Sequence, residues 1–347
     1  MKAIVTLNGY FNYGNRLQLF ALAKVTEKLG DEVVVYWPKG FKTKIKEFLK
    51  YETLLRFYFK KEIKIRRFTK KNIPRIFNGN DITCFIVGSD QVWNPEYLRT
   101  KPYLLNANSN SVKIAYAASI GKETLTKEQL SLFENNLKDY SAISVREQSA
   151  KDLLQPLTDK KIEVVLDPTL LLNSADYESL EKRPRNVEVG EKFILCYILG
   201  GKEQKAVIDE YAARRGWKVI MFSDKEGSDY GIEEFLYLIH HAELVCTDSF
   251  HACVFSFIFE RPFVAFRRTG EANYMYTRLQ NFFDTFELQN REFNGEEITK
   301  QNIDVDYAKA KKILQKEREK SLRFLKNALE IGGKTNSAKT PEVGEAI

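Results

Sequence analysis

The chain has 347 residues, enough for two domains with a core each, and its 44% hydrophobic and 29% charged residues are ordinary for a soluble globular protein. No apolar run approaches the roughly 20 residues of a membrane span, the N-terminus lacks a signal-peptide pattern, and the four scattered cysteines form no disulfide framework, so we expect a cytoplasmic protein with reduced thiols. The formal net charge of +7 makes an anionic partner plausible, which could be a phosphorylated substrate, a nucleic acid or a membrane surface.

A βαβ unit opens the chain. The predicted elements are the strand Lys2–Leu7, the helix Asn15–Leu29 and the strand Asp31–Tyr36. The connecting turn is rich in glycine and asparagine but is not G-x-G-x-x-G, so the dinucleotide fingerprint is absent. Asn15 and Arg16 are placed to meet an anion or a sugar at the start of the helix; the alternative is that Gly14 and Asn15 only shape the turn.

The next stretch, Lys42–Arg75, has a helical period and is strongly basic. A solvated helix face is the default interpretation. The interleaved isoleucines and phenylalanines favour a sharper hypothesis, contact with an anionic membrane surface, which would suit a lipid-linked substrate. We expect no nucleic-acid partner, because the basic run is short and no RNA- or DNA-binding motif accompanies it.

Polar residues directly follow each of the next predicted strands. These strands are Cys84–Val87, Lys113–Ser119, Ala142–Val145 and Glu163–Leu166. The residues after them are Gly88–Pro95, Ile120-Gly121, Arg146-Glu147 (which opens a helix, Glu147–Leu154) and Asp167-Pro168-Thr169. Alternating strands and helices predict a parallel sheet, and such sheets place ligand groups beyond the carboxyl ends of their strands.

A charged, loose segment, Ala175–Glu191, is the candidate linker, and a second α/β series follows it. Its predicted elements are the strand Phe193–Leu199, the helix Lys205–Arg215, the strand Trp217–Phe222, the helix Ile232–His241, the helix Tyr274–Phe283 and a long amphipathic helix, Tyr307–Leu329. His240 and His241 lie at a helix C-terminus and lack zinc-site spacing with any cysteine, so we interpret them as structural and expect no metal.

The most informative stretch joins these elements at residues 242–268. Leu244–Cys246 is a short strand, Thr247-Asp248-Ser249 a polar turn, Ala252–Phe259 a helix and Pro262–Phe266 the next strand. A strand that turns into a helix points free backbone N–H groups at one place, which is a natural anion site.

His251 stands in the first turn of that helix. The helix dipole disfavours the imidazolium form, so a free His251 leans neutral, and a bound phosphate returns it toward protonation. Such a histidine can act as an acid–base group. The alternative is that Asp248 or Ser249 only caps the helix and that His251 is a polar surface residue.

Six segments, in this order and spacing, resemble the polysaccharide pyruvyl transferase family over roughly Lys2 to Leu329. They are Asn12–Gln18, Val87–Asn94, Tyr116–Gly121, Ser144–Glu147, Val165–Thr169 and Thr247–His251. The resemblance implies an α/β protein with two facing Rossmann-like domains in the glycosyltransferase-B-like arrangement and an active site in the interdomain cleft. The expected division is residues 1–175 for the N-terminal domain on the acceptor side, 176–190 for the linker, 191–300 for the C-terminal domain on the donor side, 301–332 for a C-terminal helix and 333–347 for a disordered tail.

The resemblance also implies the activity: transfer of pyruvate from phosphoenolpyruvate to a pair of sugar hydroxyls as a cyclic ketal, in the biosynthesis of a capsule, an exopolysaccharide or another cell-surface glycan. Phosphoenolpyruvate is then the donor and no further cofactor is expected, while the acceptor is a sugar or a lipid-linked oligosaccharide. The family's acid–base histidine falls on His251. Ser249 replaces the arginine of many members, Ala252 replaces a glycine and Tyr276 replaces an asparagine.

These matches lead to a hypothesis for each site residue. His251 transfers protons, Asp248 orients it or caps the helix, and the Ser249, Phe250 and His251 N–H groups hold the phosphate. Arg268 or Arg278 supplies the charge that Ser249 lacks. The opposite wall would consist of Gly14, Asn15, Arg16, Gln18, Ser89, Asp90, Gln91, Trp93 and Asn94. Trp93 either stacks on a sugar ring or packs in the core.

Two rival functions remain open. One is a nucleotide-sugar-dependent glycosyltransferase on the same architecture. The other is a non-catalytic member of a polysaccharide assembly complex, which Ser249 favours because loss of an arginine can mark a silenced site.

Overall fold

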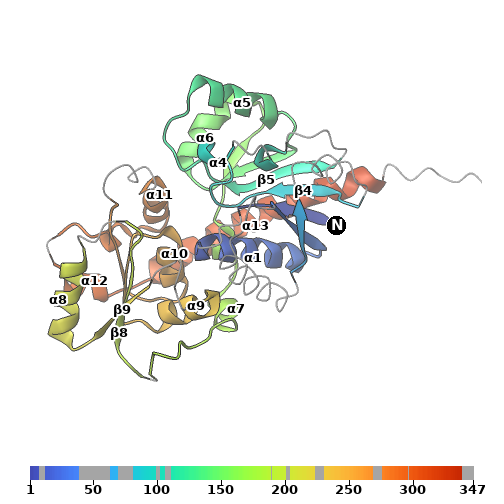
Figure 1. Ribbon diagram of the computed structural model, residues 1–347. Helices are drawn as coiled ribbons and strands as arrows, with labels where there is room; N and C mark the ends of the chain where they lie inside the picture. Colours follow the sequence, from blue (N-terminus) through green and yellow to red (C-terminus); the bar gives the residue numbers. More distant parts are fainter. Residues whose placement is uncertain are drawn as a thin grey trace, which may run out of the picture.

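The computed structural model describes residues 1–7, 12–38, 63–68, 81–98, 102–105, 111–188, 190–200, 204–222, 230–268, 276–295 and 297–337 (Figure 1). They form two parallel sheets. The first has the order β3-β2-β1-β4-β5-β6-β7 and the second β11-β10-β8-β9. The first sheet lies within the predicted N-terminal domain and the second within the predicted C-terminal domain.

The strands and helices follow the predicted alternation. The strands are β1 Lys2–Val5, β2 Val33–Pro38, β3 Ile65–Phe68, β4 Cys84–Val87, β5 Val112–Ala118, β6 Ala142–Val145, β7 Ile162–Val164, β8 Phe193–Tyr197, β9 Lys218–Met221, β10 Leu244–Thr247 and β11 Phe263–Ala265. The main helices are α1 Tyr13–Lys28, α4 Pro95–Leu98, α5 Lys127–Leu137, α6 Gln148–Leu154, α7 Ser174–Glu178, α8 Lys205–Arg215, α9 Ile232–His241, α10 Phe250–Ile258, α11 Thr277–Phe286, α12 Lys300–Ile303 and α13 Ala308–Ser337.

Several elements differ from the prediction, including the following three. Within the stretch 42–75, residues 63–68 are described, and Ile65–Phe68 is an edge strand paired with β2, so the helix predicted there is wrong. Helix α5 was not predicted, although Thr126 and Gln129 form a reciprocal capping box, which is a recognisable start signal. Helix α10 begins earlier than predicted because Ser249 already has the extended backbone of an N-cap.

Because the strands of the first sheet are parallel, the polar residues that follow them lie at one edge of the sheet. Val87 at the end of β4 pairs with Val5 of β1 and with Ala115 of β5. A register shift in β5 lets Ala118 pair with Val145 at the end of β6. An isolated bridge between Asp90 and Ala118 carries the pairing past the end of β4. The residues after β4, β5, β6 and β7 therefore converge.

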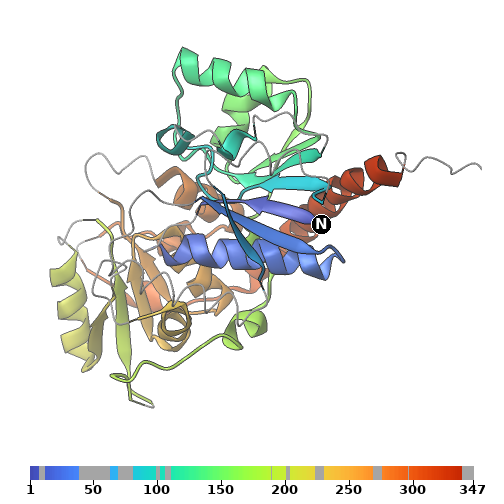
Figure 2. The same ribbon diagram turned by 45° about the vertical axis from the view of Figure 1, so that its right-hand side comes forward.

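Helix α1 of the first domain packs against the second domain. Its Tyr13 ring stacks on Phe235 at 5.2 Å and meets Phe222 edge-on at 5.0 Å, and its hydroxyl donates to the Tyr230 carbonyl. One continuous hydrophobic core contains these rings together with residues of α1 and of both sheets. Figure 2 shows α1, in blue, beside the second domain. The two domains meet over an apolar seam.

Helix α13 joins the domains a second time. Near its start, the Tyr307 hydroxyl donates to the Arg261 carbonyl of the second domain. Farther along, the Ser321 hydroxyl accepts the Leu166 N–H at 2.9 Å, and Lys2 donates to the Leu329 carbonyl. This helix ends at Ser337, within the tail predicted to be disordered, and residues 338–347 lie outside the described part. None of the described helices has the length and apolar character that a membrane crossing requires.

Candidate functional site

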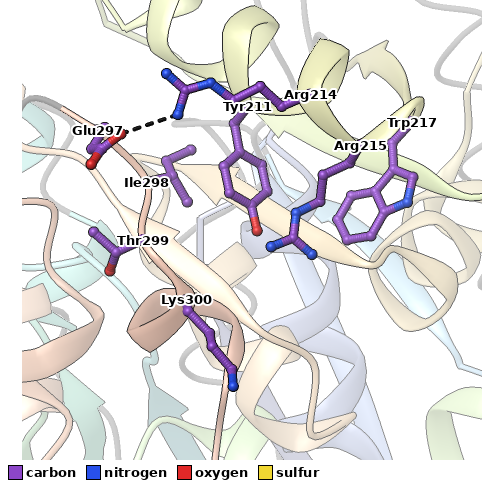
Figure 3. A pocket seen from close by; sticks show the side chains of 8 residues that line it. All are labelled: Tyr211, Arg214, Arg215, Trp217, Glu297, Ile298, Thr299 and Lys300. Carbon is purple, nitrogen blue, oxygen red and sulfur yellow. Dashed lines mark hydrogen bonds and ion pairs between the residues drawn. The ribbon is translucent and has the colours of Figure 1, made fainter.

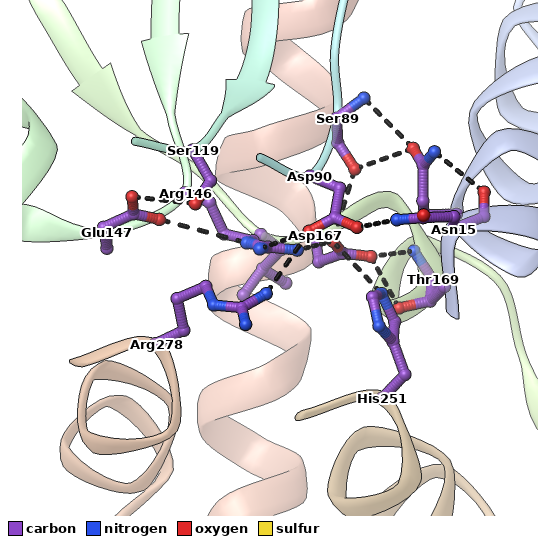
Figure 4. A network of polar contacts seen from close by, with 12 residues as sticks. Asn15, Ser89, Asp90, Ser119, Arg146, Glu147, Asp167, Thr169, His251 and Arg278 are labelled. Carbon is purple, nitrogen blue, oxygen red and sulfur yellow. Dashed lines mark hydrogen bonds and ion pairs between the residues drawn. The ribbon is translucent and has the colours of Figure 1, made fainter. Parts of the chain in front are cut away.

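A buried polar network lies at the shared edge of the first sheet and faces α10 of the second domain (Figure 4). Its charged members follow β4, β6 and β7, and helix α11 adds Arg278. The members labelled in the figure are Asn15, Ser89, Asp90, Ser119, Arg146, Glu147, Asp167, Thr169, His251 and Arg278, all at most 9% exposed. Residues from both domains therefore meet in one site.

Arg146 is the centre of this network. Its guanidinium lies 2.8 Å from Asp90 Oδ1 and 2.7 Å from Asp167 Oδ2. Burial acts to raise the pKa of both carboxyl groups. For Asp90 the charges of Arg146 and His251 outweigh burial, and for Asp167 the neighbouring His251 and the charge of Arg146 do so, so both pKa values are lowered. The three groups are held ionised at neutral pH.

Polar side chains of the first domain hold these carboxylates in place. Asp167 Oδ1 accepts both the backbone N–H and the hydroxyl of Thr169, at 3.0 and 2.7 Å. The Asn15 amide donates to Asp90 Oδ2. The Ser89 hydroxyl lies 3.0 Å from Gln18 Oε1 and 3.3 Å from Asp167 Oδ2 and donates to one of them at a time. Asn15, Gln18 and Ser89 thus support the site from behind rather than forming an open wall.

His251 reaches this network from the second domain. Its Nε2 lies 3.8 Å from Asp167 Oδ2, within ion-pair range but longer than a hydrogen bond. The residue is 5% exposed, and Nε2 has no hydrogen-bond partner among the described residues. The interpretation as a surface histidine is therefore wrong. An imidazole nitrogen with an unused bonding position beside a carboxylate can donate or accept a proton.

The start of α10 has the geometry of an anion site. Ser249 is the N-cap, but its side chain makes no capping hydrogen bond. Its own N–H donates to the Thr247 hydroxyl at 3.0 Å, so the prediction that this N–H holds phosphate is wrong. The N–H groups of Phe250, His251 and Ala252 precede the first N–H that donates within the helix, from Cys253 to the Ser249 carbonyl, and point out of the helix end.

Arg278 and Arg268 line one small cavity beside that helix end, together with Asp248 and Phe250. Burial, with help from the charge of Arg146, lowers the pKa of Arg278 to about 10, and its nearest carboxylate oxygen is Asp90 Oδ1 at 3.4 Å. Asp90 also pairs with Arg146, so two buried guanidinium groups share this carboxylate, and an arriving anion would supply further negative charge.

Asp248 has a different position from the one predicted. Its carboxylate accepts the Leu199 and Gly200 N–H groups at 2.8 and 2.7 Å and lies 3.1 Å from Arg268 Nε. Both oxygens are engaged away from His251, so Asp248 orients Arg268 and the loop after β8 instead of the imidazole or the helix end.

Trp93 is a core residue. It is 0% exposed, its indole N–H donates to the Tyr103 carbonyl at 3.0 Å, and the rings of Phe133 and Tyr140 meet it edge-on. The hypothesis that it stacks on a sugar is wrong, because no face of the ring reaches solvent or the network.

The remaining predicted wall residues lie around the site. Asn94 is buried, and its side chain accepts the Glu96 N–H at the start of α4. The Gln91 amide packs against Gly121, where a Cβ would lie 2.4 Å from Nε2. Arg16 is partly exposed and stands over the Tyr13 ring at 5.5 Å.

The cavities at the network are small. The one lined by Arg146, Asp167, Phe250 and Arg278 measures about 40 Å³, and the one beside Arg268 about 10 Å³. Ligand pockets usually measure roughly 300–1,000 Å³, so this is a closed arrangement of the two domains. A wider hollow of about 730 Å³ lies elsewhere, between α8 and the segment 297–300 (Figure 3). There Trp217 precedes β9, at the end of the second sheet opposite the network.

Sequence reasoning did not select Arg146, Glu147, Asp167 or Thr169 as site residues. The signal was present, since each follows a buried strand by one to five residues. Glu147 Oε1 accepts the Ser119 hydroxyl and the Ile120 N–H, both at 2.9 Å, and so fixes the loop after β5. Ligand groups in parallel sheets lie beyond the carboxyl ends of the strands, and this rule, applied to β6 and β7 as it was to β4, predicts all four residues.

A sequence model of the polysaccharide pyruvyl transferase family matches residues 12–270. This range contains every network residue except Arg278. No curated protein sequence matches the chain significantly.

Among solved structures, the chain is similar to UDP-GlcNAc 2-epimerase from Neisseria meningitidis bound to UDP-GlcNAc, with 13% identity, a TM-score of 0.52 and coverage of 98% of this chain and 100% of the other. It is also similar to UDP-GlcNAc 2-epimerase from Methanocaldococcus jannaschii, with 12% identity, a TM-score of 0.50 and coverage of 90% and 91%. At this identity the likeness concerns the fold alone. It confirms the predicted pair of Rossmann-like domains in the glycosyltransferase-B-like arrangement.

Proposed function

The chain belongs to the polysaccharide pyruvyl transferase family, and from this premise we propose that it moves pyruvate from phosphoenolpyruvate to two hydroxyls of a sugar, forming a cyclic ketal on a capsule, exopolysaccharide or other cell-surface glycan. The observation that carries the proposal is the position of His251. Its imidazole is buried at the domain seam, its Nε2 has no hydrogen-bond partner among the described residues, and that nitrogen lies 3.8 Å from the Asp167 carboxylate, which Arg146 also contacts.

Donor binding is assigned to the second domain. Phosphoenolpyruvate carries a phosphate and a carboxylate, so it requires several cationic or N–H donors in one place. The Phe250, His251 and Ala252 N–H groups would bind the phosphate, and Arg268 and Arg278 would neutralise the remaining charge. No cofactor is assigned, because the enol phosphate already activates the pyruvyl group.

Proton transfer is assigned to His251. The imidazolium donates its Nε2 proton to the methylene carbon, whose C=C electron pair forms the new C–H bond and leaves an oxocarbenium-like centre at the adjacent carbon. One sugar hydroxyl adds there and loses its proton to the neutral imidazole. The second hydroxyl then displaces phosphate, and its proton passes to the departing phosphate as the ketal closes. Asp167 stabilises the imidazolium, since its carboxylate faces Nε2.

Substrates enter when the domains separate, because the cavities of the closed arrangement are too small for the donor. The acceptor would approach along the first domain, past Arg16 at the start of α1. Closure then brings Asp167 back to His251 and excludes water from the reacting centre.

The deciding experiment is the exchange of His251 for asparagine. We expect acceptor-dependent release of phosphate from phosphoenolpyruvate to fall about 10²- to 10⁴-fold, the usual contribution of a general acid–base group. The unfolding temperature should stay close to that of the wild type. Wild-type turnover by a folded variant would refute the assignment. If nucleotide sugars, but not phosphoenolpyruvate, raise the unfolding temperature of the wild type, the glycosyltransferase is favoured instead.

The acceptor is proposed to be lipid-linked and to be modified by an enzyme that is peripheral at the cytoplasmic face of the membrane. The basis is the basic stretch Lys42–Arg75, most of which lies outside the described residues. Pelleting with vesicles tests this: binding should be stronger to anionic than to neutral vesicles and should weaken with added salt. Equal binding to both would remove the membrane contact.

A further inference from the structure

At the C-terminal end of helix α9, the adjacent residues His240 and His241 both contact the carboxylate of Glu181. His240 Nδ1 lies 2.8 Å from Glu181 Oε1, and His241 Nε2 lies 3.3 Å from Glu181 Oε2. If each of the three residues offers one ligand atom, these atoms all lie within 4.8 Å of one another. We propose that Glu181, His240 and His241 bind a divalent transition-metal ion of the Zn²⁺ type. The expectation of no metal considered only cysteine partners for the histidines.

The spacing suits a single ion. Zinc binds imidazole nitrogen and carboxylate oxygen at about 2.0–2.2 Å, which places the ligands of a tetrahedral ion about 3.4 Å apart. Each imidazole nitrogen already lies beside one oxygen of the Glu181 carboxylate, at 2.8 Å for His240 and 3.3 Å for His241. The two nitrogens lie within 4.8 Å of each other, so binding would draw them together around the ion, with water in the fourth position.

Neighbouring rings orient both imidazoles. His240 stacks on Phe259 with ring centroids 4.5 Å apart, and His241 stacks on Tyr237 at 4.1 Å. The side chain of His241 is 44% exposed and that of Glu181 is 10% exposed, so an ion reaches the site from solvent while the carboxylate stays anchored. These ring contacts already restrict both imidazoles, which reduces the conformational entropy lost when a metal ion binds.

The charges also favour a cation. The Glu181 carboxylate faces both imidazoles and supplies negative charge at the site. The last carbonyls of α9 add negative potential. Arg261 is the opposing charge near His241. Two imidazoles with one carboxylate suit Zn²⁺, Co²⁺ or Ni²⁺ better than Mg²⁺ or Ca²⁺, which prefer oxygen.

The ion would tie the connection between the domains to the second domain. Glu181 follows α7, which lies beside α9 (Figure 1). The next residue, Lys182, donates its N–H to the Glu233 carbonyl and pairs with Glu234 at 2.7 Å, both on α9. Since α9 packs against α1 and α10, a metal here would stabilise the closed arrangement without touching the polar network.

Metal binding to the full chain tests the proposal. After dialysis against a chelator, titration calorimetry with Zn²⁺ should give one ion per chain, and Zn²⁺ should raise the unfolding temperature. The variants E181Q and H241N should each weaken the affinity at least about tenfold and remove the shift. E178Q, at an exposed position of α7, is the matched control and should bind as the wild type does.

A further ligand variant and two spectroscopic measurements distinguish loss of metal binding from misfolding. H240N should reproduce the loss, and circular dichroism should show native secondary structure in all variants. Co²⁺ should give visible absorption in the wild type that E181Q lacks. Absence of binding at millimolar Zn²⁺, or equal affinity in folded wild type, E181Q and H241N, overturns the site.

Discussion

The imidazole of His251 lies directly against the Cα of Gly14: a Cβ at that position would be 2.0 Å from Nδ1 and 2.4 Å from Cγ. Gly14 belongs to the first turn of α1 in the first domain, and His251 to the first turn of α10 in the second. The glycine is therefore required for close approach rather than for turn geometry. Two helix N-termini meet there, and the absent side chain leaves room for the proton-transfer group.

Gly14→Ala should displace the imidazole. Alanine favours helix more than glycine does, yet the overlap with His251 should cost about 1–3 kcal/mol in the free energy of unfolding. Because a shift of about 1 Å in a reacting group can cost 10²-fold in rate, kcat should fall by about that factor. The control is Gly295→Ala, where the nearest atom to a Cβ is 3.8 Å away. Equal kcat in the two variants would contradict the contact.

Arg278→Gln should weaken donor binding. The guanidinium is buried and lies 3.4 Å from its nearest carboxylate oxygen, so it can receive an anionic substrate group. Loss of a hydrogen bond to a charged group, worth about 1.5–3 kcal/mol, should raise KM for phosphoenolpyruvate about 10- to 100-fold. Arg267→Gln removes an exposed arginine that pairs with Glu292 and should leave KM unchanged. Steady-state kinetics with varied donor compares them.

Asp167→Asn should destabilise the fold. The substitution leaves the buried Arg146 with Asp90 at 2.8 Å and Glu147 at 3.9 Å as its counter-ions, and breaking a buried pair in this way costs about 3–5 kcal/mol. Asp209→Asn breaks an exposed pair with Lys205 on α8 and should cost less than about 1 kcal/mol. Urea unfolding of both variants measures the difference. Similar midpoints would show that the Arg146 network contributes little.

Acid should weaken the protein through the same carboxylates. The folded-state pKa values of Asp90 and Asp167 lie below 3.8, the value for the free side chain. Their stabilisation is therefore complete above about pH 4 and is lost as the pH falls through the folded-state values. The free energy of unfolding should decrease below pH 4, and less steeply in Asp167→Asn than in the wild type. Identical slopes would assign the acid sensitivity to other groups.

Trp93→Phe separates a core role from a sugar contact. Loss of indole volume and of the hydrogen bond to the Tyr103 carbonyl should destabilise the fold by about 1–3 kcal/mol. The KM for the acceptor should not change, because the ring is fully buried. Trp217→Phe, at a partly exposed tryptophan, is the matched control for stability. A rise in acceptor KM without loss of stability would restore the sugar contact.

The amino-acid sequence by itself determined the local structure. Periodicity and turn residues predicted α8 and α9 with their observed bounds, and the strand–turn–helix pattern placed His251 in the first turn of α10. Each of these features depends on residues that are close together in the chain, so the local sequence pattern predicts it. The position of Asp90 just after β4 also predicted that it lies at the edge of the sheet where parallel sheets bind ligands.

Only the tertiary structure decided which of these residues meet. The Asp167 carboxylate faces His251 across the domain seam, Arg146 links Asp167 to Asp90, and Gly14 fits under the imidazole. Trp93 follows the same strand as Asp90 yet points into the core. Such outcomes follow from how the two domains pack and how each strand exit turns. They join residues far apart in the chain, and no local spacing carries that information.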